Sequence, residues 1–299
     1  MATNEGQPPE PDPEPEAPPP IGESLGPIPG PPPGLTARSP APPRRPASRA
    51  AAPLLAYVLH THDWSETSLV VELFTRVQGR VVVVAKGAKR PTSQLRPVLL
   101  PFQPVLTLLG RTPADERGEV HLLRTAEWVG GTALLGPDAL FAGFYVNELL
   151  LKLLARQDPH PRLFDAYADT LAALASEGEQ PAALRAFELT LLRELGLLPE
   201  LASVTLTAAA LRPDAPYALQ PEAGLVPDAL GLPGQAWVGL EAALAHGSGA
   251  ALRAACKPVA AGLRGPLRAT LHYHLGSTPL RTRHVWQGVQ RLTEIRPSR

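Results

Sequence analysis

Short runs of β-branched and aromatic residues alternate with turn-forming pieces in the first half of the chain. They predict five strands, at residues 55–60, 68–75, 81–86, 105–109 and 120–125. Five short strands within about 75 residues suit a small closed barrel, because closure leaves no strand edge exposed. An oligonucleotide/oligosaccharide-binding (OB) barrel is the commonest solution of this size, and an SH3-like barrel is the alternative.

The pattern becomes helical after residue 137. Apolar residues recur at spacings of three and four over residues 138–156 and 162–176, which predicts two amphipathic helices. A third helix is expected to begin near Pro181 and to end at Gly196. The predicted fold class is therefore α+β, with a five-stranded OB-type barrel followed by a helical domain.

The last third of the chain mixes two patterns. Residues 199–234 are rich in Pro, Ala and Gly and predict a loop-rich insertion with a few short strands. Helical periodicity returns at residues 237–245 and 258–275, and residues 281–292 allow one more short basic helix.

The first 53 residues contain 18 of the 37 prolines and almost no large apolar side chains. Proline removes backbone donors, and too little apolar surface is present to offset the entropy of ordering, so a disordered tail is expected. A partner-binding or DNA-contacting arm is the functional alternative. The predicted division is a tail at residues 1–53, a barrel at 54–132 and a helical domain at 133–299.

Charge is balanced overall, with 28 Lys and Arg against 28 Asp and Glu, but it is unevenly distributed. Residues 55–130 carry 9 basic against 7 acidic side chains, residues 131–248 carry 6 against 14, and residues 249–299 carry 9 against 1. A polyanion is therefore expected at the beginning and the end of the folded part.

Several classes of protein are disfavoured by the sequence. Cys256 is the only cysteine, which excludes an internal disulfide and any site built from several thiolates. Neither a signal-peptide pattern nor an apolar run of about 18 residues is found, so we expect a cytoplasmic protein without a membrane span. No nucleophile elbow or phosphate-binding glycine loop is present, so neither an enzyme nor a cofactor is predicted.

The stretch from Gly79 to Pro104 holds the strongest candidate chemistry. A run of valines feeds a segment whose five cations have no acidic residue among them: Arg80, Lys86, Lys89, Arg90 and Arg96. Such a cluster can follow a phosphate backbone, because each cation that meets a phosphate releases condensed counterions. A solvated basic loop is the other interpretation, and spacing alone does not decide between them.

Aromatic and histidine residues offer weaker signals. Trp64, Tyr57 and Phe102 are able to stack on bases, although we expect them to be buried core rings. The spacings of His60 with His62, and of His272 with His274, resemble metal ligands, but structural or surface roles are favoured, and no metal site is predicted.

The chain resembles the RecO family of recombination mediators in six stretches that occur in the family's order. They are Tyr57-Val58-Leu59-His60 with Asp63-Trp64-Ser65-Glu66-Thr67-Ser68, Gly79-Arg80-Val81 with Val84-Ala85-Lys86-Gly87-Ala88, Pro101-Phe102-Gln103-Pro104, Tyr145-Val146-Asn147-Glu148-Leu149-Leu150, Leu184-Arg185-Ala186-Phe187-Glu188-Leu189 with Leu195-Gly196, and Leu271-His272-Tyr273-His274-Leu275-Gly276 with Leu280-Arg281-Thr282-Arg283.

The resemblance implies a non-enzymatic DNA repair role. Family members bind single- and double-stranded DNA, anneal complementary strands and act with RecR to load RecA onto strands coated by the single-stranded DNA-binding protein. They also dock that protein's acidic C-terminal tail on the helical domain. Many members carry a four-cysteine zinc module near residues 200–230, where this chain has no cysteine, so we expect packing to hold that region instead.

With this resemblance, the five basic residues of the barrel become the expected DNA contacts, and four C-terminal ones extend them: Lys257, Arg268, Arg281 and Arg283. Arg185 is expected to grip the terminal carboxylate of the acidic tail, and Phe187 and Leu191 to line an apolar groove beside it. A simple ion pair of Arg185 with Glu188 on a solvated helix face is the other interpretation. An OB module that binds RNA or assists transcription or translation remains the alternative function, and a metal-dependent enzyme is the third.

Overall fold

The computed structural model describes residues 52–111, 119–130, 134–282 and 285. The chain from Arg49 onward forms one compact unit. The predictions for the proline-rich tail up to residue 51, and for most of a helix at 281–292, therefore lie outside the described residues.

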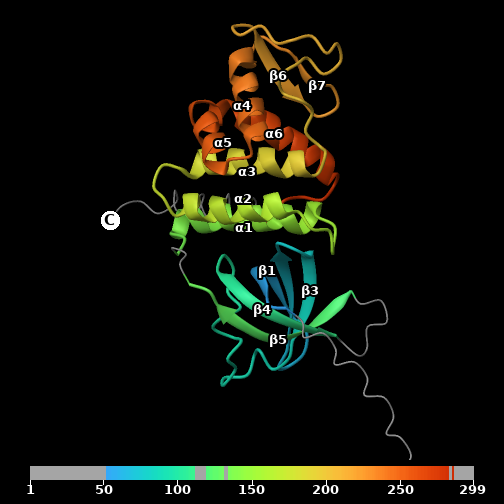
Figure 1. The fold of residues 1–299 in the computed structure, drawn as a ribbon, viewed down its shortest axis with the longest axis vertical. Coiled ribbons are helices and arrows are strands. Elements are labelled where there is room, and N and C mark those ends of the chain that lie inside the picture. Colours follow the sequence, from blue (N-terminus) through green and yellow to red (C-terminus); the bar gives the residue numbers. More distant parts are fainter. Residues whose placement is uncertain (1–51, 112–118, 131–133, 283–284, 286–299) are drawn as a thin grey trace, which may run out of the picture. The chain divides into compact units, whose positions relative to one another are not determined.

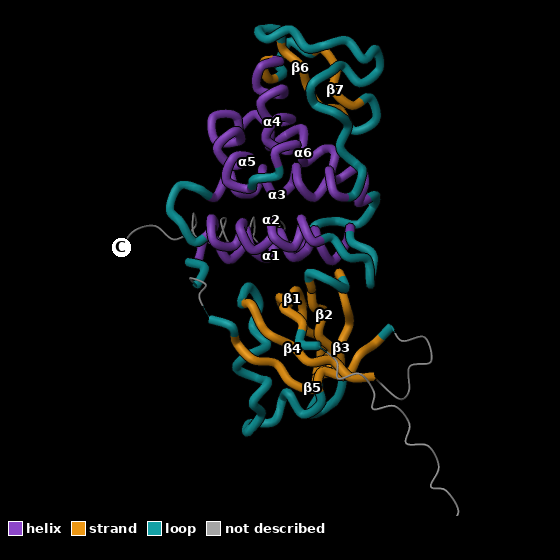
Figure 2. The backbone as a smooth tube through the Cα atoms, viewed as in Figure 1, coloured by secondary structure: helices purple, strands orange, loops and turns teal. Residues whose placement is uncertain are grey.

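The first five strands close into a barrel with the order β1-β2-β3-β5-β4 (Figures 1 and 2). They are β1 (Leu54–Asp63), β2 (Leu69–Thr75), β3 (Gly79–Ala85), β4 (Pro104–Arg111) and β5 (Val120–Trp128). Every pairing is antiparallel except that of β3 with β5, which is parallel. This mixed, closed order confirms the OB-type barrel.

Alternation along the strands fills the barrel. Every second residue of β2 and β3 points inward, and Val71, Leu73, Val81 and Val83 are buried in one cluster with residues of the other strands. Apolar contact along this face holds the five strands in register. The register shifts once in β1, between Val58 and His60, so that Leu59 is an extra residue opposite β2.

Six α-helices are described after the barrel. They are α1 (Pro137–Leu153), α2 (Pro161–Leu174), α3 (Gln180–Glu194), α4 (Gly234–His246), α5 (Gly249–Cys256) and α6 (Ala260–Leu275), with a short 3₁₀ turn, η1 (Lys257–Val259), between the last two. Proline begins each of the first two helices, as its fixed φ and missing N–H allow. In Figure 1, α1 and α2 lie next to the barrel, and α3 lies between α2 and the later helices, while α1 also contacts α6.

Helix α5 was not predicted from the sequence. Its eight residues give little periodicity, but Ser248 caps its start by accepting a hydrogen bond of 3.3 Å from the backbone N–H of Ala251. Among the described residues, no helix is long and apolar enough to cross a membrane.

The helices and the barrel share one core. Tyr57 and Phe74 of the barrel pack their rings against Phe164 and Tyr167 of α2, with centroids 5.0–6.0 Å apart. All four rings are buried in the cluster that also contains the helical leucines. Burial of Tyr57 and Phe102 confirms that these two rings are core residues.

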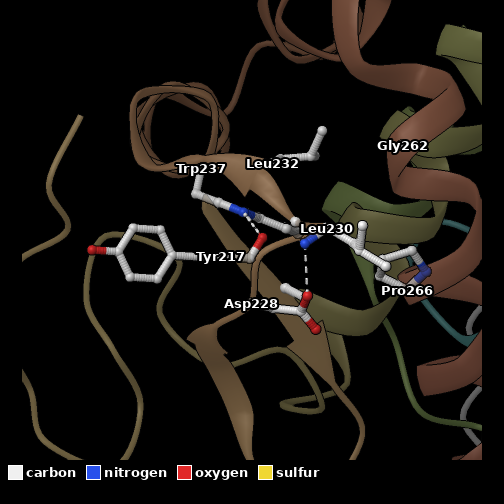
Figure 3. Close-up of a pocket in the computed structure, with 9 residues that line it drawn as sticks. Tyr217, Asp228, Leu230, Leu232, Trp237, Gly262 and Pro266 are labelled. Carbon is white, nitrogen blue, oxygen red and sulfur yellow. Dashed lines mark hydrogen bonds between the residues drawn. The ribbon is translucent and has the colours of Figure 1, made fainter. Parts of the chain in front are cut away.

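Three short strands lie within the loop-rich segment: β6 (Pro216–Gln220), β7 (Gly224–Pro227) and β8 (Leu232–Pro233). The buried Trp237 of α4 donates its indole N–H to the carbonyl oxygen of Tyr217 at 2.9 Å, beside a cavity of about 230 Å³ (Figure 3). Leu219 and Leu225 are buried in the same core. Packing holds this segment in the structure, and in the described part of the chain no three His, Cys, Asp or Glu residues gather as a metal site would require.

Candidate nucleic-acid interface

Two loops at one end of the barrel are joined to each other. The backbone N–H of Lys89 donates to the carbonyl oxygen of Thr67 at 2.9 Å, and the Lys89 ammonium donates to the carbonyl oxygen of Ser65 at 3.1 Å. The same ammonium lies 3.3 Å from a carboxylate oxygen of Asp63. The β1–β2 loop (residues 64–68) and the basic segment after β3 (residues 86–96) therefore form one surface, here called the joined-loop surface.

Three cations of this surface are exposed: Lys86, Arg90 and Arg96. Within the described ranges, no carboxylate pairs with any of them. Lys89 is partly buried, and its ammonium forms an ion pair with Asp63. Four of the five predicted cations thus belong to the joined-loop surface, and three of them are exposed without a carboxylate partner among the described residues.

Arg80 lies apart from this surface. Its guanidinium is 3.3 Å from Glu72 and donates to the carbonyl oxygen of Leu154, just after α1, at 3.0 Å. Burial lowers the pKa of Arg80, an effect that the Glu72 carboxylate opposes. Only 14% of the side chain is exposed. The structure therefore places Arg80 at the junction of barrel and helices.

The predicted C-terminal cations are spread over several elements. Lys257 pairs with Glu179 at 2.7 Å, Arg268 is exposed on α6, and the backbone N–H of Arg281 donates to Glu148 at 2.8 Å. Arg283 is outside the described residues. The described residues give these cations no contact with the joined-loop surface.

The three residues predicted to hold an acidic tail are all buried. Phe187 and Leu191 are core residues, and Arg185 pairs with Glu188 at 2.6 Å. Tyr145 donates its hydroxyl to the same Glu188 oxygen at 2.8 Å. Burial raises the pKa of Glu188, and Arg185 and Tyr145 oppose that rise. The intrahelical ion pair considered from the sequence is present, but it is enclosed by helices instead of lying on a solvated face.

Histidines on β1 lie side by side. The ring centroids of His60 and His62 are 4.3 Å apart. Burial lowers the pKa of His60, and the neighbouring His62 lowers it further. This pairing disfavours a charged imidazole at His60.

The burial expected for Trp64 is wrong. Its indole follows the end of β1, and 68% of the residue is exposed on the joined-loop surface. Tyr57, nearer the start of the same strand, is 5% exposed and packs against the rings of Phe164 and Tyr167 on α2. The run of turn-forming residues around Trp64 was the one available signal for an exposed ring.

An OB barrel with exposed cations, fixed to a helical region, is an arrangement typical of nucleic-acid-binding proteins. Sequence comparisons place the chain more exactly. The family model "Recombination protein O N terminal" matches residues 54–131, and "Recombination protein O C terminal" matches residues 135–284.

Relatives named DNA repair protein RecO match over nearly their whole length. Those of Verminephrobacter eiseniae and Acidovorax ebreus are each 51% identical, over 255 and 262 residues; each match covers 82% of this chain and 99% and 100% of the relative. A relative from a Polaromonas species is 49% identical over 245 residues, with 79% and 96% covered. The chain belongs to the RecO family of DNA repair proteins, which are non-enzymatic recombination mediators.

Proposed function

We propose that this chain binds single- and double-stranded DNA through its barrel, anneals complementary strands and, together with RecR, helps to load RecA onto strands coated by the single-stranded DNA-binding protein. We place this work in the bacterial cytoplasm, at the nucleoid. The observation that carries the DNA-binding step is the joined-loop surface, where Lys86, Arg90 and Arg96 are exposed without a carboxylate partner among the described residues.

Charge alone is sufficient for the DNA-binding step. A phosphate backbone gains affinity from each cation that displaces its counterions, whatever the base sequence. Lys257, Arg268, Arg281 and Arg283 would add a second basic region at a distance along the chain. Two basic regions allow one protein to hold two strands, and the second contact then forms at high effective concentration. Annealing follows from this arrangement without nucleotide hydrolysis.

A salt series tests the DNA-binding step. Fluorescence anisotropy of a labelled single strand is expected to give a slope of log affinity against log salt of roughly −2 to −4, which corresponds to about three to five phosphates. Combining Lys86→Ala, Arg90→Ala and Arg96→Ala is expected to reduce the slope by about 2. Arg76→Ala is the matched control, because this barrel arginine already pairs with Asp165 at 3.0 Å. Tighter binding of RNA than of DNA of the same sequence would favour the accessory role on RNA.

We also propose that the acidic tail of the coating protein binds to the helical region near Arg185. Arg264 and Arg268 are exposed on α6, and both act electrostatically on the enclosed group: Arg264 on Glu188 and Arg268 on Tyr145. These exposed guanidiniums would attract the tail's carboxylates. Arg185 would then exchange Glu188 for the terminal carboxylate, while Phe187 and Leu191 shape the apolar floor beneath it.

Binding of a synthetic acidic tail peptide tests this second step. Arg268→Ala is expected to lower the affinity for the peptide at least threefold. The stability of the fold is expected to be unchanged, because the Arg268 side chain is exposed. Arg185→Ala is expected to lower the affinity for the peptide further, but it also leaves Glu188 without its ion pair, so its unfolding midpoint must be measured in parallel. Unchanged peptide affinity in both folded variants would contradict the proposal.

A further inference from the structure

Trp64 is exposed in an unusual setting. It is 68% exposed at the end of β1, and among the described residues no aromatic ring packs against its indole. Leaving so large an apolar ring in water forgoes the free energy that its burial would release. Burial in the barrel core therefore does not explain the presence of a tryptophan at this position.

The loop that carries Trp64 is held in place by its own hydrogen bonds. The backbone N–H of Trp64 donates to the carbonyl oxygen of Ser68 at 3.2 Å, and the N–H of Ser68 donates to the hydroxyl of Ser65 at 3.2 Å. Lys89 then ties this loop to the basic segment through Thr67 and Ser65. A ring presented by a closed loop loses little conformational entropy when a ligand binds.

Charge around the ring points to the chemistry of its ligand. Two carboxylates lie beside Trp64 in the sequence: Asp63 is paired with Lys89, and Glu66 is exposed. Lys86, Arg90 and Arg96 of the tied segment are also exposed, so cations outnumber carboxylates on this surface. A ligand that suits this surface has a flat π-face for the indole and phosphates for the cations. A nucleotide within a single strand has both, whereas bases within a duplex are already stacked on one another. In OB barrels, the loop between the first two strands is one of the places where oligonucleotides bind.

We propose that Trp64 stacks on one unpaired base of a bound single strand and thereby gives the barrel a preference for single-stranded over double-stranded DNA. The inference rests on the proposed DNA binding and adds to it a residue that discriminates between the two forms of DNA. Stacking on an aromatic side chain tolerates every base, so this preference is for strandedness and not for sequence.

Anisotropy with a labelled oligo(dT) strand and with a duplex of equal length tests the inference on the full-length chain. Trp64→Ala is expected to lower the affinity for the single strand about 5- to 100-fold and to change the affinity for the duplex by less than twofold. Trp64→Phe is expected to keep most of the affinity, because a ring remains. The matched control is Trp128→Ala, since Trp128 is 62% exposed on the same barrel, at the end of β5.

Salt dependence separates stacking from charge. The single-strand salt slope of Trp64→Ala is expected to equal that of the wild type, because no phosphate contact is removed. Equal single-strand affinities of Trp64→Ala and the wild type, or equal losses in Trp64→Ala and Trp128→Ala, would overturn the stacking while leaving DNA binding intact. A parallel loss for duplex and single strand would also overturn it. Failure of the wild type to bind either form of DNA would instead remove the proposed function itself.

Discussion

The side-chain amide of Asn147 on α1 donates a hydrogen bond of 3.0 Å to the carbonyl oxygen of Leu59 on β1. Leu59 is the extra residue where the register of β1 against β2 shifts. The amide oxygen of Asn147 accepts a second hydrogen bond, of 2.7 Å, from the hydroxyl of Tyr167 on α2. One buried amide thus joins a strand irregularity to two helices, and it accounts for an asparagine among the apolar residues of α1.

Removal of this amide is expected to destabilise the whole unit. Asn147→Ala leaves the Leu59 carbonyl and the Tyr167 hydroxyl buried without these partners, which costs about 1–3 kcal/mol. Urea unfolding measures the loss. Thr190→Ala is the control, because its half-buried hydroxyl donates to the carbonyl of Ala186 on its own helix, and it is expected to cost well under 1 kcal/mol. Equal losses in the two variants would show that Asn147 does not join the elements as described.

Gly79, at the start of β3, is required for two separable reasons. Its φ is +64°, and a Cβ built there would lie 1.9 Å from the carbonyl oxygen of Asp158. Gly178 has a similar φ of +77° but nothing within 4 Å. Gly178→Ala is expected to cost about 1–2 kcal/mol from backbone strain alone, and Gly79→Ala at least about 2 kcal/mol more, because the backbone must also shift. Thermal or urea unfolding of both variants measures the two losses in unfolding free energy. Equal losses would show that the close approach of Gly79 to the Asp158 backbone adds nothing to the cost.

Glu148 of α1 anchors the chain beyond α6. Its carboxylate accepts from the backbone N–H of Thr282 at 3.0 Å and from the Thr282 hydroxyl, and it lies 2.9 Å from the Lys152 ammonium. Burial raises the pKa of Glu148, but these hydrogen bonds, together with that from Arg281, outweigh burial and hold the pKa below its ordinary value of 4.5.

The sign of the pH dependence follows from this lowered pKa. The stability contributed by Glu148 is fully present above about pH 4.5 and is lost as the pH falls through the folded-state pKa. Glu148→Gln is therefore expected to be less stable than the wild type at pH 7, and the difference is expected to shrink in acid. Trypsin cleavage at Arg281 is expected to become faster in the variant at pH 7. Glu222→Gln, at an exposed carboxylate, is the control and should leave both readouts unchanged.

Replacement of Arg80 by alanine is expected to lower stability, whereas replacement of Lys86 by alanine is expected to affect DNA binding. Arg80→Ala removes one ion-pair partner of the buried Glu72 and leaves it Arg156 at 2.9 Å, so a loss of about 1–3 kcal/mol in unfolding free energy is expected. Lys86→Ala is expected to stay within about 0.5 kcal/mol and to reduce the DNA salt slope by about 0.7. A salt slope reduced equally by Arg80→Ala would mean that its guanidinium leaves Glu72 to meet a phosphate.

Local pattern was sufficient for most of the secondary structure. The five predicted strands and the first three helices are present, because alternation and helical periodicity report which face of each element is buried. Helix α5 was missed, since eight residues with one cap carry too few periods to be distinguished from a loop. For the candidate site, the sequence supplied the cations but not their exposure.

The sequence by itself determined the barrel, the helical region and the family, because these depend on residue patterns that are local along the chain. Tertiary structure alone decided which side chains are available to a ligand. Arg80 and Lys86 are only six residues apart, yet one is enclosed by Glu72 and Leu154 and the other is exposed. Tyr57 lies on β1 and Trp64 in the turn that follows it, but Tyr57 is buried against α2 whereas Trp64 is 68% exposed. The exposure of a side chain depends on packing by elements that are distant in the sequence, and a local sequence pattern does not indicate which elements these are.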